Sequence, residues 1–518
     1  MFVEAEQLTN GARIETDICI LGAGAAGISL ARELDGSGFE VCLIESGGFD
    51  YEMQVQDLYR GDISGRSYYP LHATRLRMFG GSTNHWGGFS RQFDDIDFEP
   101  RPWVKWSGWP FGLDELQPYY ARAHRTCELG PPDYSVDTWT RPYFQGLALE
   151  NTLLQNGVFQ NSTPTRFGET YRAQIEASEN IRAVLHATAT NIALHPDGRR
   201  VKRVELATLS GKRFFASAKR YVIALGGIEN PRLLLNSNDV LRNGIGNGRD
   251  LVGRYFMEHP IMPVGELLVT DPDSSTDLYR RRNVDGTAVH GFITVRPEIL
   301  RARKMINCGV LLQRRNWGDS SDGPASVKHV MDKIASGRVP DELLEHVANI
   351  VTDLDGILSA TYNKLRDRRL FNVIYWAESV PNPDSRVKLS ADTDPFGKRR
   401  VDLDWRLTDQ DRENLRNLHA VLAQELGRTG LGRLHLSFDA DADAWPEDLV
   451  GSHHHLGTTR MAESPDRGVV DGNCRVHGIE NLYVAGSSVF PTAGQANPTL
   501  TLVALAIRLA DHLRRDTA

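Results

Sequence analysis

The N-terminal stretch TDICILGAGAAGISLARELDGSGFEVCLIE, residues 16–45, constrains the fold more than any other part of the chain. Residues 16–21 are apolar enough for a buried parallel strand, residues 25–35 are rich in alanine and leucine as in a helix, and residues 39–44 are a second strand pattern. A strand, a helix and a parallel strand in this order form a βαβ unit. The sequence therefore predicts an α/β fold that begins with a Rossmann-like unit.

The turn between the first strand and the helix carries the motif GxGxxG at Gly22, Gly24 and Gly27. In such motifs the first glycine permits the tight turn, the second lets the backbone approach a pyrophosphate, and the third lets helix and strand pack closely. The helix N-terminus presents free N–H groups and a positive dipole end to the phosphates. Glu45 closes the second strand, where it can accept hydrogen bonds from ribose hydroxyls. The unit predicts a dinucleotide site, and both FAD and NAD use such a site.

Length, charge and cysteine content exclude several classes of protein. A chain of 518 residues is expected to form two or three structural units. The net charge is −8 and no basic face dominates, which argues against nucleic acid as a main partner. The five cysteines form no CxxC pair, so we expect neither a disulfide framework nor a metal or iron–sulfur centre.

The N-terminus has no secretory signal pattern, and no run of eighteen apolar residues occurs. We therefore expect a cytoplasmic enzyme without a transmembrane segment.

Further along the chain, periodicity indicates several elements. Residues 113–129 have a helical pattern, and residues 181–223 alternate as in an antiparallel meander. Thr408 followed by Asp411 predicts an approximate capping box at the start of a helix. Residues 327–368 have apolar residues at helical spacing, which predicts a helical insertion. We expect this insertion to be a hairpin packed on its own domain, with a lid or a subunit contact as alternatives.

A set of motifs along nearly the whole chain resembles the glucose–methanol–choline (GMC) flavin oxidoreductases. The motifs are, in chain order, GAGAAG with IESGG, FGGSTNHWGG (79–88), SGWPFGLDELQPYY (107–120), LGGIENPRLLLNS (225–237), LVGRYFMEHP (251–260), HHHLGTTRM and AGQANPTLT. Two pieces, GGSTNHW and NPDSRVKLS, are most similar to the branch with pyranose oxidases, glycoside 3-oxidases and bacterial sugar dehydrogenases.

The resemblance implies a Rossmann-like FAD-binding domain beside a substrate domain built on an antiparallel β-sheet with helices. The FAD-binding domain would be discontinuous, and a segment with a loop and a helix would cover the flavin. The implied division is 1–60, 180–260 and 440–518 for the FAD-binding domain, 61–130 for the flavin-covering segment, and 131–179 with 261–439 for the substrate domain, which includes the helical insertion at about 327–368.

The resemblance also implies FAD as the cofactor. The candidate cofactor-binding residues are Gly22, Gly24, Ala25, Ala26, Gly27, Glu45, Ser46, Gly80, Gly81, Ser82, Asn84, His85, Trp86, Gly87, Ala485, Gly486, Asn497, Pro498 and Thr499. His85 stands where pyranose oxidases attach their flavin covalently, so it would either bond to the flavin 8α-methyl group or pack against the ring edge. Trp86 is expected to form a wall of the cavity.

His454 and Asn497 are the candidate catalytic residues. His454 occupies the position of the family's catalytic histidine, and a histidine can accept the hydroxyl proton near neutral pH. Asn497, before Pro498, would cap the last helix or bind the substrate oxygen, or do both. If the HHH stretch is extended, the neighbours of His454 point away from it, and a metal site there is the disfavoured alternative. Glu258, His259 and Pro260 are interpreted as supporting residues.

The function that the resemblance implies is FAD-dependent oxidation of an alcohol to a carbonyl, with hydride transfer to flavin N5. The substrate would be a sugar, glycoside or related polyol, preferably at a secondary ring hydroxyl (C3 or C2). The alternative is a primary hydroxyl of an aminoglycoside-type or other natural-product intermediate. Oxygen or another acceptor would reoxidise the flavin. A flavoenzyme without net redox chemistry and a non-catalytic FAD-binding scaffold are the rival classes, and the oligomeric state cannot be read from the sequence.

Overall fold

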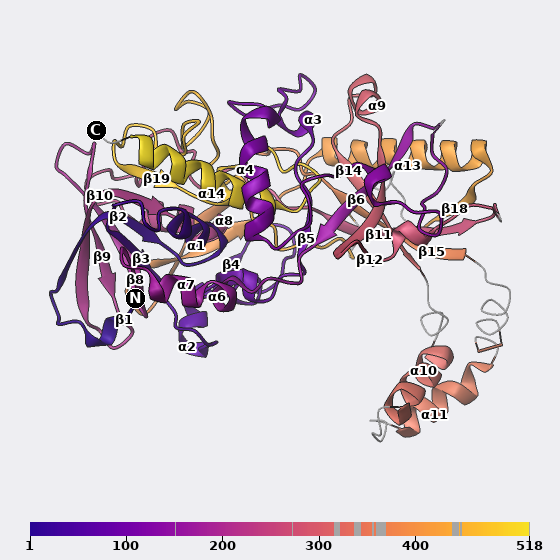
Figure 1. Cartoon of the computed structure of the whole chain (residues 1–518), viewed down its shortest axis with the longest axis horizontal. Coiled ribbons are helices and arrows are strands. Elements are labelled where there is room, and N and C mark those ends of the chain that lie inside the picture. Colours follow the sequence, from indigo (N-terminus) through magenta and orange to yellow (C-terminus); the bar gives the residue numbers. More distant parts are fainter. Residues whose placement is uncertain are drawn as a thin grey trace.

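The computed structural model of the chain describes residues 1–150, 152–271, 273–314, 322–335, 343–354, 357–358, 369–437, 445 and 448–516. Two lobes lie side by side along the long axis, each built around a large sheet, and both chain termini belong to the same lobe (Figure 1). We call this one the N-terminal lobe and the other the second lobe. In the described part of the chain, no helix combines the length and the apolar character needed to cross a bilayer.

The sheet of the N-terminal lobe has the strand order β1–β7–β3–β2–β10–β9–β8, with β19 beside β10. The strands β1, β7, β3, β2, β10 and β19 pair in parallel, which confirms the predicted Rossmann-like unit. Bounds are β1 (Phe2–Glu4), β2 (Arg13–Leu21), β3 (Val41–Ile44), β7 (Ile181–Leu185), β8 (Thr188–Leu194), β9 (Val201–Ala207), β10 (Arg213–Ile223) and β19 (Leu482–Val484).

The expected meander at 181–223 is right for three strands and wrong for the first. β8, β9 and β10 are antiparallel neighbours, as alternation predicts. β7 instead joins the parallel part of the sheet between β1 and β3. Its sequence is buried on both faces at Ala183, Val184 and Leu185, which is typical of a parallel strand covered on both sides.

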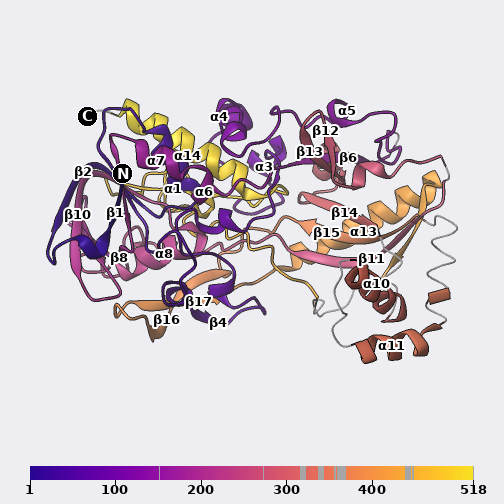
Figure 2. The same ribbon diagram turned by 60° about the horizontal axis from the view of Figure 1, so that its bottom comes forward.

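Helix α14 (Pro498–Arg515) runs against α1 (Ala25–Glu33) and α4 (Leu113–Thr126) on one face of this sheet (Figure 2). Leu500, Val503, Ala504 and Ile507 are buried along α14 at spacings of three and four residues, which is the apolar stripe a packed helix needs. The last helix of the chain thus lies beside the first. α4 confirms the helix predicted over 113–129.

The second lobe contains a largely antiparallel sheet in the order β18–β11–β15–β14–β13–β6–β5, with β12 beside β13. Bounds are β5 (Phe89–Ser90), β6 (Leu154–Asn161), β11 (Ile261–Val269), β12 (Arg282–Val284), β13 (Thr287–Val295), β14 (Cys308–Arg314), β15 (Arg369–Ala377) and β18 (Gly432–Leu436). A small third sheet contains β4 (Gly61–Ile63), β17 (Arg399–Asp404) and β16 (Arg386–Thr393). β17 pairs in parallel with β4 and antiparallel with β16, and both β16 and β17 contact α8 (Gly226–Asn236).

Helix α13 (Asp409–Thr429) packs against this sheet and begins at the predicted capping box. The Asp411 N–H donates to Thr408 Oγ1 at 3.2 Å, and the Thr408 N–H donates to Asp411 Oδ2 at 2.6 Å. These two bonds satisfy N–H groups that a helix start leaves without intrahelical partners.

The predicted helical insertion contains α10 (Asp322–Ala335) and α11 (Leu343–Thr352), which pack on each other; the rest of 327–368 lies outside the described residues except 353–354 and 357–358. Figure 1 shows both helices set apart from the second lobe, and Leu343, Val347 and Val351 are exposed at a spacing of four residues. The hairpin is therefore present, but this apolar face of α11 does not pack on its own domain.

One ion pair in the second lobe is buried completely. Arg101 donates from Nη1 to Glu378 Oε2 at 2.8 Å and from Nη2 to Oε1 at 2.6 Å, and both side chains are 0% exposed. The Asn307 N–H also donates to Glu378 Oε2. The pair joins the loop before α4 to the end of β15, so loss of Arg101 would leave the buried Glu378 carboxylate without its cation.

Replacing Arg101 by methionine should lower the free energy of unfolding by about 3–5 kcal/mol, because Glu378 would remain buried without its cation. Urea unfolding followed by circular dichroism measures this change. The matched control is Arg13→Met, whose ion pair with Glu15 is exposed and should matter by less than about 1 kcal/mol. Equal effects of the two substitutions would contradict the special role of the buried pair.

Candidate active site

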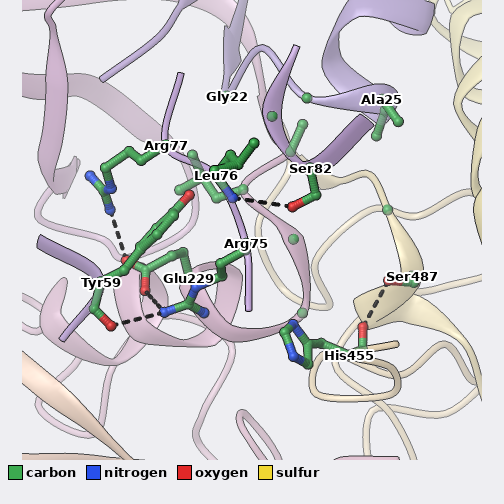
Figure 3. Close-up of a pocket in the computed structure, with 18 of the residues that line it drawn as sticks. Gly22, Ala25, Tyr59, Arg75, Leu76, Arg77, Ser82, Glu229, His455 and Ser487 are labelled. Atoms are coloured by element: carbon green, nitrogen blue, oxygen red, sulfur yellow. Dashed lines mark hydrogen bonds and ion pairs between the residues drawn. The ribbon is translucent and has the colours of Figure 1, made fainter. Parts of the chain in front are cut away.

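A cavity of about 600 Å³ lies along the carboxyl ends of β2, β10 and β19. Its wall is formed by turns that follow these strands, by the loop 73–89, by the histidine stretch 452–455 and by the start of α14. Figure 3 shows how side chains and turns from these distant segments surround one space. Ligands of open α/β sheets bind outside the carboxyl ends of the strands, and this cavity lies at such a position.

The register of the parallel strands explains why these turns meet. Leu21 of β2 pairs with Ile223 of β10, and Ile223 pairs with Val484 of β19. The next residues, Gly22, Ala224 and Ala485, therefore leave the sheet at the same edge and all line the cavity. Gly22 has φ 103°, and an added Cβ would lie 2.6 Å from the Ala224 carbonyl oxygen, so this turn requires glycine.

The second glycine-rich motif lies directly on this turn. The Gly80 N–H donates to the Ala23 carbonyl oxygen at 2.8 Å, and an added Cβ at Gly81 would come within 3.0 Å of Gly24 Cα. Two motifs that are separate in the sequence thus form one wall. Of the candidate cofactor-binding residues, Gly27, Gly80 and Asn84 do not line the cavity: Gly27 packs α1 on the turn, and Asn84 donates to the Phe79 carbonyl.

The cavity has the features that a flavin dinucleotide needs. Gly24, Gly226 and Gly486 all line it, and an added Cβ at any of them would meet no protein atom within 4 Å. These three backbones therefore border open space, as close approach to a ligand requires. The N-termini of α1 and α14 both reach this wall through Ala25 and Pro498, and helix N-termini favour anionic groups.

Glu45 is held at the same wall by the glycine turn. Its Oε2 accepts from the Ala23 N–H at 2.8 Å and its Oε1 accepts from the Gly47 N–H at 3.1 Å. A carboxylate oxygen has a second lone pair, so both atoms can still accept from ribose hydroxyls. The next residue, Ser46, is hydrogen-bonded through its hydroxyl to Thr188 at 2.7 Å.

The wall of the cavity also contains a buried charge cluster that the sequence analysis did not predict. The Glu229 carboxylate forms ion pairs with Arg75 at 3.1 Å, Arg77 at 3.0 Å and Arg232 at 3.0 Å. The guanidinium groups of Arg75 and Arg77 also lie over the Tyr59 ring (Figure 3). Burial alone would raise the pKa of Glu229, but the three guanidinium groups lower it to about 2. The cluster is charged and rigid. Its members are far apart in sequence, so only the RLR spacing beside the glycine motif could have pointed to it.

His454 and Asn497 meet in the wall of the cavity. Asn497 Nδ2 lies 3.4 Å from His454 Nε2, and both residues line the cavity. Asn497 occupies the N-cap position of α14, but its side chain makes no capping hydrogen bond. Its Oδ1 is buried without a partner in the described part of the chain. The carboxamide is thus directed to the histidine and the cavity, and the expected side-chain cap is not made.

The expectation that the neighbours of His454 point away from it depended on an extended stretch, and the stretch is not extended. His453 has φ 63°, and His453, His454 and His455 all line the cavity. The His455 ring is hydrogen-bonded to Tyr68 Oη at 3.0 Å, and the His453 ring lies 4.5 Å from that of Tyr69. Burial lowers the pKa of His454 and of His455 well below 6.5, and nearby basic side chains, which disfavour a further positive charge, lower it more.

Beneath the histidine stretch lies the buried carboxylate of Glu258. It accepts from Tyr68 Oη, from the His454 N–H at 3.0 Å and from the Ser452 N–H at 3.1 Å. Burial raises the pKa of Glu258, and these donors oppose that shift. Glu258 therefore positions the backbone of the histidine stretch, although the two segments are far apart in the sequence. Among the described residues, no group of three or more His, Cys, Asp or Glu is arranged to hold a metal ion.

His85 and Trp86 both line the cavity. His85 is close enough to His453 to lower the pKa of His453, after the larger effect of burial. Burial and the nearby Arg166 lower the pKa of His85 itself, so its imidazole is neutral. Trp86 donates from its indole nitrogen to the Thr165 carbonyl at 2.9 Å, which fixes it as part of the wall.

Two protein-family models match this chain, and both describe oxidoreductases. The FAD dependent oxidoreductase family matches residues 17–367, and the GMC oxidoreductase C-terminal family matches residues 381–506. This chain is a GMC oxidoreductase. It is an FAD-dependent enzyme that acts on alcohols, and its fold is the Rossmann-like and antiparallel combination expected from the sequence.

Three curated relatives illustrate the range of this GMC oxidoreductase's similarity. Paromamine 6′-oxidase of Streptomyces fradiae is 26% identical and aligns over 96% of this chain and 91% of its own length. The fructose dehydrogenase large subunit of Gluconobacter japonicus is 23% identical over 97% of this chain and 98% of its own. C-glycoside 3-oxidase of Microbacterium trichothecenolyticum is 31% identical, but over 27% of this chain and 26% of its own.

The glycine-rich wall can be tested by two matched substitutions. Gly24→Val should leave a folded protein with little FAD, because the new side chain would project into the open cavity without meeting protein atoms. Gly27→Ala should destabilise the fold itself, since its Cβ would lie 1.8 Å from the Gly22 carbonyl oxygen. Circular dichroism reports the fold and the yellow absorbance reports FAD. If the Gly24→Val protein retained a full complement of FAD, the cofactor would have to bind outside this cavity.

Proposed function

We propose that this GMC oxidoreductase oxidises an alcohol of a sugar, glycoside or related polyol to a carbonyl. His454 serves as the base and Asn497 holds the substrate oxygen. The observation that carries the proposal is the 3.4 Å approach of Asn497 Nδ2 to His454 Nε2 in the wall of the FAD-sized cavity. An oxygen atom in the cavity, within hydrogen-bond distance of both nitrogens, can give its proton to the imidazole and accept a hydrogen bond from the carboxamide.

When bound, FAD supplies the hydride acceptor, its N5 atom. His454 prepares the alcohol by taking the hydroxyl proton on Nε2 as the carbinol C–H bond breaks. Because burial lowers the pKa of His454, its imidazole starts uncharged and has a lone pair to offer at neutral pH. Asn497 orients the same oxygen, and the N-terminus of α14 directs its positive dipole end into the cavity, where negative charge develops.

The charges of the cavity wall favour a neutral substrate. Three carboxylates line the described wall, Glu45, Glu229 and Asp394. Glu45 accepts from two backbone N–H groups, Glu229 is paired with three arginines, and Asp394 is paired with Arg232 at 2.7 Å. Arginines neutralise Glu229 and Asp394, and the remaining lone pairs of Glu45 are assigned to the ribose hydroxyls, so none of the three carboxylates is left to bind an ammonium group. This supports a neutral carbohydrate, and the similarity to the C-glycoside 3-oxidase favours oxidation at a secondary ring hydroxyl, C3 or C2.

A second candidate is oxidation of a primary hydroxyl on an aminoglycoside-type intermediate. It is favoured by the alignment with paromamine 6′-oxidase, which extends over 96% of this chain. A panel of neutral sugars, glycosides and aminoglycosides, each tested for anaerobic bleaching of the flavin, separates the two candidates. Admission of air and then of a dye acceptor identifies the electron acceptor. A stoichiometric carbonyl product excludes the non-redox and non-catalytic alternatives.

The division of the chain into domains is also part of the proposal. It is supported by the sheets, since strands from 1–60, 180–260 and 440–518 join the sheet of the N-terminal lobe, while most strands of 261–439 join that of the second lobe. The proposed units are 1–60, 180–260 and 440–518 for FAD, 61–130 as the covering segment, and 131–179 with 261–439 for the substrate.

Replacing His454 by alanine should slow anaerobic reduction of the flavin by substrate about 10²–10⁴-fold, because the hydroxyl proton loses its acceptor. Stopped-flow absorbance measures the rate, and retention of yellow colour shows that the cavity is intact. In the wild-type enzyme the rate should stay constant as the pH falls to 6.5 and decline only below it, since the pKa of His454 is lowered by burial and by His259, His455 and His453. If the flavin of His454→Ala were reduced at the wild-type rate, His454 would not be the base.

We propose further that His85 is bonded to the flavin 8α-methyl carbon. One His85 nitrogen forms the N–C bond, the imidazole and the methyl group each lose a proton, and the two electrons pass to the acceptor that the enzyme already uses. The neutral imidazole and its place beside His453 support this role. Acid precipitation of the wild-type protein should give a yellow pellet, and His85→Ala a colourless pellet with yellow supernatant. A colourless wild-type pellet means that His85 only packs against the ring edge.

A further inference from the structure

A chain of hydrogen bonds runs from the loop before α14 through His259 to the proposed base. His259 Nε2 lies 2.8 Å from the Gly494 carbonyl oxygen and 3.2 Å from that of Ala493. On the other side of the ring, His259 Nδ1 lies 2.8 Å from His454 Nδ1. His259 is fully buried and does not line the cavity, so it acts on the site only through its neighbours.

The direction of the first bonds is decided by their acceptors. A carbonyl oxygen can only accept, so His259 Nε2 must carry hydrogen toward Gly494 and Ala493. Burial lowers the pKa of His259 to about 4, so the ring is neutral near neutral pH and has one N–H. His259 Nδ1 is therefore a bare acceptor that faces His454.

The tautomer of His454 follows from that of His259. Two ring nitrogens 2.8 Å apart need one hydrogen between them, and His259 Nδ1 does not supply it. His454 Nδ1 must then carry the hydrogen and donate it. Because the His454 ring is neutral as well, its Nε2 has the free lone pair, and this is the atom that faces Asn497 and the cavity.

The opposite tautomer is opposed by the same contacts. With hydrogen on His454 Nε2, the bare Nδ1 atoms of the two rings would face each other at 2.8 Å in a dry interior. Ser452 Oγ lies 2.9 Å from His454 Nδ1, but its one hydrogen already has acceptors in Glu258 Oε2 at 3.1 Å and the His259 carbonyl at 3.0 Å. The Ser452 contact thus also favours the tautomer with hydrogen on His454 Nδ1, because Ser452 Oγ can accept a hydrogen bond from that N–H.

We propose that His259 is a positioning residue that holds His454 in the tautomer with Nδ1 protonated and Nε2 bare toward the cavity. This inference rests on the proposed function, in which His454 Nε2 takes the substrate proton. The carbonyls of the loop 493–494 are the source of the preference. The segment that carries Asn497 therefore sets both halves of the site, one through its side chain and one through its backbone.

Two substitutions of His259 separate this role from simple packing. In His259→Asn, the side-chain oxygen takes the place of Nδ1 and can accept from His454, while the bond to Gly494 is lost. In His259→Gln, the side-chain nitrogen takes the place of Nε2 and can keep the bond to Gly494, but no acceptor faces His454. Flavin reduction by substrate should stay within about fivefold of wild type in the asparagine variant and fall about 10–100-fold in the glutamine variant, as loss of the correct tautomer slows a histidine base.

A packing or anchoring role predicts the reverse order, with the glutamine variant faster, and that order would overturn the proposal. Affinity for substrate and FAD content should be similar in both variants, so the difference belongs to the rate and not to binding.

Nitrogen NMR of the holoenzyme labelled with ¹⁵N-histidine tests the tautomer without turnover, with His454 assigned from its loss in His454→Gln. The bare type of resonance is expected for Nε2 in the wild type, and a protonated type would refute the proposal. If the flavin of His454→Gln is reduced by substrate as fast as that of the wild type, the assignment of His454 as the base is wrong. If that variant is slow but the wild-type Nε2 is protonated, only the role of His259 is wrong.

Discussion

The parallel pairing of β2, β10 and β19 is the constraint on which the rest of the structure depends. Backbone hydrogen bonds fix the register in which Leu21, Ile223 and Val484 end their strands side by side. Three turns that are hundreds of residues apart in sequence then begin at one edge of the sheet, and their small residues leave room for a dinucleotide. Every other part of the site, including the loop 73–89 and α14, is placed relative to that edge.

The reacting end of the cavity depends on a second physical rule, that a dry interior accepts neutral imidazoles more readily than charged ones. His259, His454 and His455 are all kept neutral by burial, so each offers one donor and one acceptor. The carboxylate of Glu258 is buried beside them and is satisfied by hydroxyl and backbone N–H donors. The proposed base, His454, thus begins with a free lone pair and a fixed orientation.

Much of the cofactor site could be predicted because its signals are local. GxGxxG specifies a turn and a helix start within a few residues, and the structure brings Gly22 and Gly24 to the cavity wall. His454 and Asn497 were found through resemblance, and the structure brings them together. The sequence left open whether the HHH stretch is extended, and the positive φ of His453 shows that it is not. The His453 ring contacts Tyr69 and the His454 N–H donates to Glu258, and no local pattern reveals these contacts.

By itself the sequence determined the βαβ start, the GMC family, the FAD site and the identity of the proposed catalytic pair, since these depend on short-range backbone geometry and on ordered motifs. Only the tertiary structure decided that β7 joins the parallel strands, that Arg75, Arg77 and Arg232 share Glu229, and that His259 faces His454. These contacts join residues far apart in the chain. They arise from sheet register and burial, which act between segments and leave no trace in the spacing of neighbouring residues.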